Sequence, residues 1–326
     1  MNKIHNIRPF KFVPYLKSVL WGGERIAQYK GIHTDQHKIG ESWEISGVQG
    51  HESVVAEGDD KGLILPELIH KYKGALVGNA VYEKYGDRFP LLVKIIDAKR
   101  DLSLQVHPND ELAHKRHESC GKTELWYIID ACGEAKIYAG MAKNISKDDL
   151  RRLVAGGEIM DAVVAHDSHA GDLFYLPAGR LHSIGAGNLL AEIQQTSDIT
   201  YRVYDFNRLD VNGKPRELHT ELAIDAIDYE VHDNYKIDYE QVEDGVAELM
   251  DCEYFDVRKI NVNSVCNLDL SHQDSFCIVM CLAGAAEVTD NFMNTVPLRQ
   301  GETILVPAVS SSLSIEGRAT LLSATM

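Results

Sequence analysis

The stretch LSLQVHPND, residues 102–110, carries side chains that could do chemistry. Apolar and polar residues alternate there, so a β-strand would place Ser103, Gln105 and His107 on one face. Three polar groups in a row on one strand face usually meet solvent. On the inner wall of a β-barrel, however, the same row would form a set of metal ligands.

A second histidine is held in place by a predicted turn. The stretch GDLFYLPAGRLHSIG, residues 171–185, has two apolar runs joined by a corner at Pro177 and Gly179, and His182 follows that corner. The chain has 14 histidines, so any single one is more often a surface or core residue than a ligand. The local context of His107 and His182 distinguishes these two from the rest.

A carboxylate is available in CGKTELWYIID, residues 120–130, where Glu124 interrupts an apolar strand. A charged residue in such a strand is rarely buried without a partner. One interpretation pairs Glu124 with Lys122 on the sheet surface, and the alternative makes it a metal ligand. Glu41 and Glu44 have opposite strand parity, so at most one of them can face a cavity.

Two imidazoles, one carboxylate and a side-chain amide suit a divalent ion such as zinc. The set Gln105, His107, Glu124 and His182 carries one formal negative charge, so a bound ion would stay positive and act as a Lewis acid. Ferrous iron is the competing ion, because two histidines and one carboxylate also make an oxygenase triad. The amide of Gln105 favours zinc.

These side chains need a β-rich scaffold to bring them together. Short runs rich in Val, Ile, Tyr and Leu dominate the chain and are bounded by Gly, Pro, Asn and Asp. Helical patterns are fewer, and Ser146 opens one of them with a capping pattern. The helical stretches are LPELIHKY, PNDELAHKRHE, SKDDLRRLV and PRELHTELAIDAI. We therefore expect a mainly β fold, a sandwich or jelly roll with short helical insertions.

The histidine-bearing corner has a second copy near the end of the chain. GETILVPAVSSSLSIEG, residues 301–317, repeats the spacing from glycine to proline but has Val309 in place of the corner glycine and Ser312 in place of the histidine. We expect two β units, residues 1–235 with the helical insertions and residues 236–326 without the metal chemistry. The acidic stretch 228–244 would connect them.

The amino-acid composition narrows the possible protein classes and binding partners. Charged residues make up 25% and hydrophobic residues 44% of the 326 residues, as in a globular protein. The net charge of -16 argues against nucleic acid or an anionic membrane as partner. The start of the chain lacks the apolar stretch of a secretory signal. Six scattered cysteines without a CxxC pair predict reduced thiols in a cytoplasmic protein.

Four motifs together resemble the type I mannose-6-phosphate isomerases in their short bacterial form: LSLQVHPND, GKTELWYI, LPAGRLHSIG and TSDITYRVYDFNR. The spacing from Gly171 to His182 is similar to the second motif of the cupin superfamily. The resemblance runs from about Pro14 to Arg208 and implies two cupin-like jelly-roll barrels, the second degenerate. The family's asparagine after the second-motif histidine is Ala186 here, and the helical domain of longer members is absent.

Carried over by position, the resemblance assigns a role to each of ten residues. The ligands of one Zn²⁺ ion per chain fall on Gln105, His107, Glu124 and His182. The catalytic positions fall on Lys122, Glu192, Asp198 and Arg202, and the positions associated with the substrate's phosphate fall on Lys94 and Ser103.

The resemblance implies interconversion of mannose 6-phosphate and fructose 6-phosphate through an enediol. Arg202 would stabilise negative charge, whereas the base stays open among a metal-bound water, Glu192, Asp198 and a histidine. The rivals are a ferrous cupin dioxygenase and a sugar-phosphate sensor without turnover. We expect a small sugar phosphate as partner, and no nucleic acid, membrane or obligate protein partner.

Overall fold

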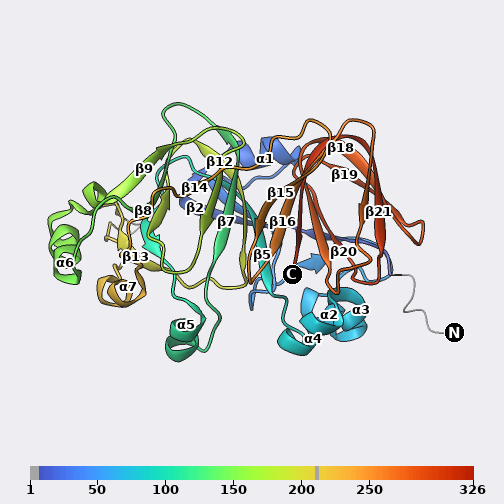
Figure 1. The fold of residues 1–326 in the computed structure, drawn as a ribbon, viewed down its shortest axis with the longest axis horizontal. Helices are drawn as coiled ribbons and strands as arrows, with labels where there is room; N and C mark the ends of the chain where they lie inside the picture. The colour runs from blue at the N-terminus through green and yellow to red at the C-terminus, as the bar shows by residue number, and fades with distance from the viewer. Residues whose placement is uncertain (1–6, 210–212) are drawn as a thin grey trace.

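The computed structural model describes residues 7–209 and 213–326. The first six residues of the N-terminal stretch in which a secretory signal would lie are therefore outside the described part of the chain. Its strands form three antiparallel sheets in two groups that lie side by side (Figure 1). The expectation of a mainly β fold is confirmed, whereas the count of two barrels stays a prediction. No helix of the described residues is long and apolar enough to cross a membrane.

Two sheets of seven and five strands form the first group, here called the N-terminal sheets. In spatial order the larger contains β14 (Lys236–Ile237), β10 (Leu173–Leu176), β7 (Glu124–Ala131), β12 (Asn188–Gln195), β5 (Leu91–Asp97), β3 (Ile39–Ile45) and β2 (Tyr15–Gly23). The smaller contains β13 (Tyr201–Tyr204), β6 (Leu104–Val106), β11 (His182–Ile184), β8 (Lys136–Met141) and β9 (Val163–Asp167).

The second group is one sheet of nine strands, here called the C-terminal sheet. Its main path is β15 (Gly245–Asp251), β16 (Asp256–Val262), β21 (Ser312–Thr325), β18 (Cys277–Asp290), β20 (Thr303–Val306), β1 (Phe10–Val13) and β4 (Val54–Val55). Two further strands, β17 (Val265–Asp269) and β19 (Thr295–Arg299), pair with β21 and β18.

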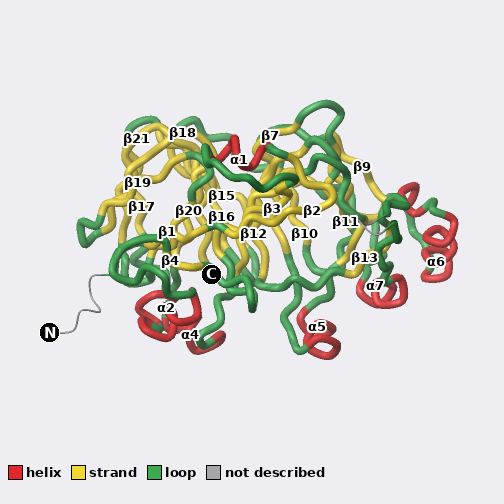
Figure 2. Tube along the Cα trace, turned by 180° about the vertical axis from the view of Figure 1, so that it is seen from behind, coloured by secondary structure: helices red, strands yellow, loops and turns green. Residues whose placement is uncertain are grey.

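Helices lie at the periphery of both groups (Figure 2). All four stretches predicted to be helical contain a helix, and Ser146 caps α6 as expected by accepting a hydrogen bond from the Asp149 amide. The helices are α1 (Arg25–Lys30), α2 (Leu65–Tyr72), α3 (Gly74–Val77), α4 (Asn79–Tyr85), α5 (Asp110–His117), α6 (Lys147–Gly156), the 3₁₀ helix η2 (Ile159–Ala162) and α7 (Thr220–Ala226).

Strand parity decides which residues of the seven-stranded sheet face the site. On β5 and β7, Val93 and Leu125 join the core shared with the C-terminal sheet. Their neighbour Trp126 belongs to a separate core inside the N-terminal sheets. Because successive strand residues point to opposite faces, Lys94 and Glu124 project into the space between the N-terminal sheets.

Strand pairing crosses the boundary predicted at residue 235. The N-terminal strand β1 pairs with β20, with Phe10 opposite Leu305. Segments α2–α4 also contact the C-terminal sheet, where the Phe276 amide donates to the Val77 carbonyl over 3.3 Å. The division at residue 235 stays a prediction about domains, and parts of the chain before it complete the C-terminal sheet.

The second copy of the corner contacts a helix. The amides of Ala308 and Val309 donate to the carbonyls of Leu76 and Ala75, over 2.9 and 3.2 Å. Aliphatic side chains such as Val279 and Leu321 fill the adjoining core of the C-terminal sheet. The copy that has lost the histidine therefore anchors α3 to an apolar core.

Gly78 offers a test of this contact between α3 and the C-terminal sheet. Its φ is +96°, and an added Cβ would lie 2.0 Å from the Asp274 carbonyl oxygen. We expect Gly78→Ala to lower the free energy of unfolding by about 3 kcal/mol, from backbone strain and overpacking combined. Gly86 has φ +61° and open space around it, so Gly86→Ala should cost only about 1 kcal/mol. Denaturant melts that give equal losses for both variants would contradict this account.

Candidate metal centre and substrate cavity

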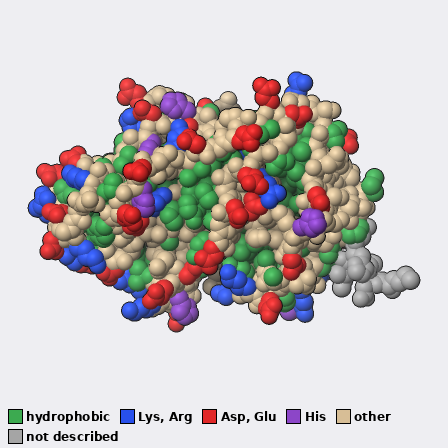
Figure 3. Space-filling view, viewed as in Figure 1, with side chains coloured by type: hydrophobic (Ala, Val, Ile, Leu, Met, Phe, Trp, Pro, Cys, Tyr) green, Lys and Arg blue, Asp and Glu red, His purple; other side chains and the backbone are tan. Residues whose placement is uncertain are grey.

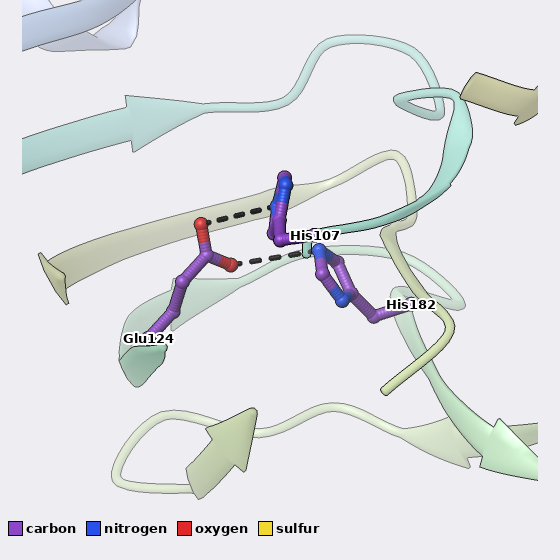
Figure 4. Close-up of side chains that lie close together, drawn as sticks. All are labelled: His107, Glu124 and His182. Atoms are coloured by element: carbon purple, nitrogen blue, oxygen red, sulfur yellow. Dashed lines mark ion pairs between the residues drawn. The ribbon is translucent and has the colours of Figure 1, made fainter. Parts of the chain in front are cut away.

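Three predicted ligands converge at one point between the N-terminal sheets. His107 follows β6, Glu124 begins β7 and His182 begins β11, and all three side chains point toward one another (Figure 4). The Nε2 atoms of His107 and His182 lie 3.4 and 3.5 Å from the two oxygens of Glu124. Their candidate ligand atoms all lie within 4.8 Å of one another.

Both imidazoles are oriented by backbone carbonyls. Nδ1 of His107 lies 2.8 Å from the Ile199 carbonyl oxygen, and Nδ1 of His182 lies 2.8 Å from that of Arg180. A carbonyl only accepts, so each Nδ1 carries the proton and each Nε2 presents a lone pair toward Glu124. Burial, with help from the Lys122 charge, lowers the pKa of His107 to about 4, so its imidazole is neutral, the form that binds metals.

Glu124 is a fully buried carboxylate whose oxygens lack normal hydrogen bonds. The Lys122 ammonium lies 2.6 Å from Oε1, yet neither oxygen accepts a well-oriented hydrogen bond from the described residues. Burial opposes ionisation, but the adjacent Lys122 charge outweighs it and, with the two nearby imidazoles, holds the pKa of Glu124 well below its usual range. The carboxylate is therefore charged and has acceptor capacity that a cation would satisfy.

Gln105 completes the set of four. It lies on β6 directly opposite His182 on β11 and opposite Arg202 on β13. Its amide nitrogen lies 3.4 Å from Nε2 of His182. Two imidazole nitrogens, a carboxylate and a side-chain amide are an ordinary donor set for a divalent ion such as zinc, so these residues fit the group that was predicted.

The Pro177–Gly179 corner sets the two histidines side by side. Gly179 has φ +95°, a conformation that glycine adopts without strain. Its amide donates to the carbonyl of His107 over 2.9 Å. The corner that precedes His182 is thus bonded to the backbone of His107, the other candidate histidine ligand.

A cavity of about 420 Å³ opens beside this centre. It contains all the predicted catalytic and substrate-binding residues, together with Gln105. Its charged lining comprises five cations, Lys17, Lys94, Lys122, Arg202 and Arg216, and three carboxylates, Glu41, Glu192 and Asp198. Acidic and basic side chains are interspersed over the outer face seen in Figure 3. The cavity is thus cationic within a chain of net charge -16.

Lys94 lies on the floor of the cavity, almost fully buried, and is occupied by acceptors. Its ammonium donates to Glu192 and to Gln194, over 2.7 Å in each case, and lies 3.8 Å from Glu41. Burial alone would lower the pKa of Lys94, but Glu192 and Glu41 outweigh it and raise the pKa above its ordinary value. Ser103 is buried in the cavity wall.

The two predicted acids of this region differ in their surroundings. Glu192 is buried, and its second oxygen accepts from the indole N–H of Trp126 over 2.8 Å, so both oxygens are engaged. Asp198 is exposed in the cavity lining and has no hydrogen bond or ion pair to the described residues. Of the two, Asp198 has the carboxylate that can accept a proton without breaking an existing contact.

Arg202 is half-buried next to the centre. One guanidinium nitrogen donates to the Glu217 carbonyl over 2.8 Å, whereas the buried Nε has no partner among the described residues. Burial, and then the nearby charge of Arg216, lower the pKa of Arg202 from its ordinary value. A guanidinium remains charged at neutral pH after such a shift, and here it is short of hydrogen-bond acceptors.

Sequence reasoning missed Arg216, Lys17 and Trp43, which also line the cavity. Arg216 lies in the stretch PRELHTELAIDAI, which we assigned only as helical, and it precedes the helix that forms there. Nothing in a single sequence distinguishes it from a surface arginine. Glu41 faces the cavity and Glu44 instead pairs with Lys30, as the opposite parity of the two acids predicts.

Comparison with known proteins agrees with this geometry. Residues 10–127 match the type I phosphomannose isomerase catalytic domain, and residues 246–326 match the mannose-6-phosphate isomerase cupin domain. Mannose-6-phosphate isomerase ManA of Bacillus subtilis is 37% identical over 95% of this chain and 96% of its own length. The Streptococcus mutans mannose-6-phosphate isomerase is 35% identical over 91% and 92%.

A solved structure supports the same relationship over the whole chain. The crystal structure of the mannose 6-phosphate isomerase from Bacillus subtilis has a TM-score of 0.89 and 34% identity, covering 98% of this chain and all of that one. Both matched domains, the full-length relatives and this shared fold lead to one assignment. The chain belongs to the type I mannose-6-phosphate isomerase family.

Proposed function

We propose that this enzyme interconverts mannose 6-phosphate and fructose 6-phosphate and that it depends on a zinc ion. The observation that carries the proposal is the fully buried Glu124 between two imidazoles whose Nε2 atoms face it, beside a cationic cavity. Gln105, His107, Glu124 and His182 would hold the ion. When bound, it would act as a Lewis acid that stabilises negative charge on a substrate oxygen.

The reaction moves one proton from C2 to C1 and one from the C2 hydroxyl to the C1 oxygen, with an enediol between the two sugars. We assign the carbon proton to Asp198, because its carboxylate lines the cavity and has no competing contact among the described residues. Arg202 would stabilise the negative charge that grows on oxygen. Lys122, whose ammonium lies beside Glu124, supplies a second cation or the proton for the oxygen.

Glu192 then has a supporting role. Its oxygens hold Lys94 and Trp126 and so fix the floor of the cavity. Lys94 and Ser103 would contact the substrate from that floor, which restricts the orientation of C1 and C2 relative to Asp198. All six cysteines are free thiols, and we expect the enzyme to act in the cytoplasm.

Metal removal tests this proposal. We expect the purified protein to isomerise mannose 6-phosphate in an assay coupled to fructose 6-phosphate consumption. Treatment with a chelator should lower turnover at least about 100-fold, because Lewis-acid stabilisation is worth several kcal/mol. Zinc added back should restore it. A wild-type protein with a full complement of zinc and no turnover, or one whose activity needs ferrous iron and oxygen, would contradict the proposal.

A further inference from the structure

We propose that the phosphate of the substrate is bound at the arginine side of the cavity, by Arg216 together with Arg202, while Lys94 contacts the sugar. This inference rests on the proposed function and makes it more specific. It concerns the one end of a sugar phosphate that takes no part in the proton transfer, so binding and turnover can be separated experimentally.

The positive charge of Lys94 is already compensated by neighbouring acceptors, so Lys94 is a poor ligand for the substrate's phosphate. Its ammonium already donates to Glu192 and Gln194, and Glu41 lies 3.8 Å away. Glu41 also accepts from the Trp43 indole over 2.6 Å and lies 3.7 Å from Lys17. Two lysines thus face two carboxylates on this side of the cavity. A phosphate placed there would have to be buried against both acids.

On the side of the cavity lined by Arg202 and Arg216, positive charges outnumber buried carboxylates. Asp205 is buried, and it accepts hydrogen bonds from both Arg208 and Arg216. With Arg202 this makes three guanidinium groups around one buried carboxylate. The side chain of Glu217 is 83% exposed, so it screens the cluster only weakly. Two positive charges are left without a buried counter-charge, and a phosphate carries the charge that compensates them.

Arg216 is also held in position before any ligand binds. Its Nε donates to Oδ2 of Asp205 over 2.7 Å, its Nη2 donates to Oδ1, and its side chain retains 24% exposure. Among the described residues no partner engages its Nη1, which remains available to an anion. A guanidinium fixed in this way loses little conformational freedom when it binds a phosphate.

The same segment fixes Arg202 next to it. The Arg202 amide donates to Nδ1 of His219 over 3.0 Å, and the His219 amide donates to the Arg202 carbonyl over 2.7 Å. Arg216 lies three residues before His219, and both Arg216 and Arg202 line the cavity. The positive charges of Arg202 and Arg216 repel each other, as the lowered pKa of Arg202 indicates. An anion bound between the two guanidinium groups would relieve that repulsion.

Kinetics of Arg216→Gln test the inference. We expect the KM for mannose 6-phosphate and the inhibition constant for inorganic phosphate to rise together by about 30-fold, the loss of one or two charge-assisted hydrogen bonds. The kcat should change less than about threefold, because the reacting carbons stay in place. Arg216→Lys keeps the charge without the planar fork and should give an intermediate KM.

A matched control is Arg152→Gln. Arg152 is also an arginine paired with one aspartate, Asp149, but it lies on the exposed face of α6 and should leave every constant unchanged. Thermal melts and zinc content show whether each variant is folded and loaded. An Arg216→Gln enzyme with wild-type KM and phosphate inhibition would overturn this inference while leaving the isomerase proposal intact. A wild type without isomerase activity would instead overturn the proposed function.

Discussion

Glu124→Gln should give a folded protein that retains less than about a tenth of the wild-type zinc and loses turnover by about 1,000-fold or more, because a neutral amide replaces the site's one anionic ligand. The side chain keeps its size, so the surrounding core around Trp126 need not rearrange. The substitution also leaves the Lys122 ammonium buried without its 2.6 Å partner. That loss adds a moderate destabilisation, which a denaturant melt would detect.

Metal analysis and the isomerase assay on the same preparation check this prediction. Glu111→Gln is the matched control, because Glu111 lies in the first turn of α5, away from the cavity, and should keep wild-type zinc and turnover. A Glu124→Gln protein with full zinc and normal turnover would show that the metal binds elsewhere. Full zinc with lost turnover would instead show that the carboxylate acts on the substrate and does not hold the ion.

His107, Glu124 and His182 lie at one centre as expected, and each was singled out by a local sequence pattern. Alternation around Gln105 and His107 and the corner before His182 place each group on a strand end whose direction follows from parity. The same rule separated Glu41, which faces the cavity, from Glu44. The predicted helices were also local, since capping residues and apolar spacing lie within a few positions of one another.

The features that the sequence did not indicate, such as the pairing of β1 and the position of Arg216, depend on contacts between distant segments. The pairing of β1 with β20 joins strands nearly three hundred positions apart, and no short pattern encodes it. Arg216 is held at the cavity by Asp205, and His219 is bonded to the Arg202 backbone, yet Asp205 and His219 look like ordinary surface residues in isolation. The different states of Glu192 and Asp198 likewise follow from Lys94 and Trp126 on other strands.

Arg202→Ala should lower kcat by about 100- to 1,000-fold while zinc content stays at the wild-type level, as expected for a group that stabilises charge formed during the reaction. Among the described residues, the Arg202 side chain makes no hydrogen bond or ion pair with the four candidate ligands. Its backbone pairs with Gln105 between β13 and β6. Its backbone hydrogen bonds with His219 do not depend on the side chain. The ligand geometry should therefore survive the substitution.

Stability provides the control for this variant. The Arg202 guanidinium has an unpartnered buried Nε and lies beside the like charge of Arg216, so its removal relieves repulsion while it loses packing. We expect the free energy of unfolding to change by no more than about 1 kcal/mol. Because Arg202→Ala should lower kcat as well as raise KM, whereas Arg216→Gln should raise KM with little change in kcat, one assay separates the two arginines. Near wild-type kcat with intact zinc would remove Arg202 from the mechanism.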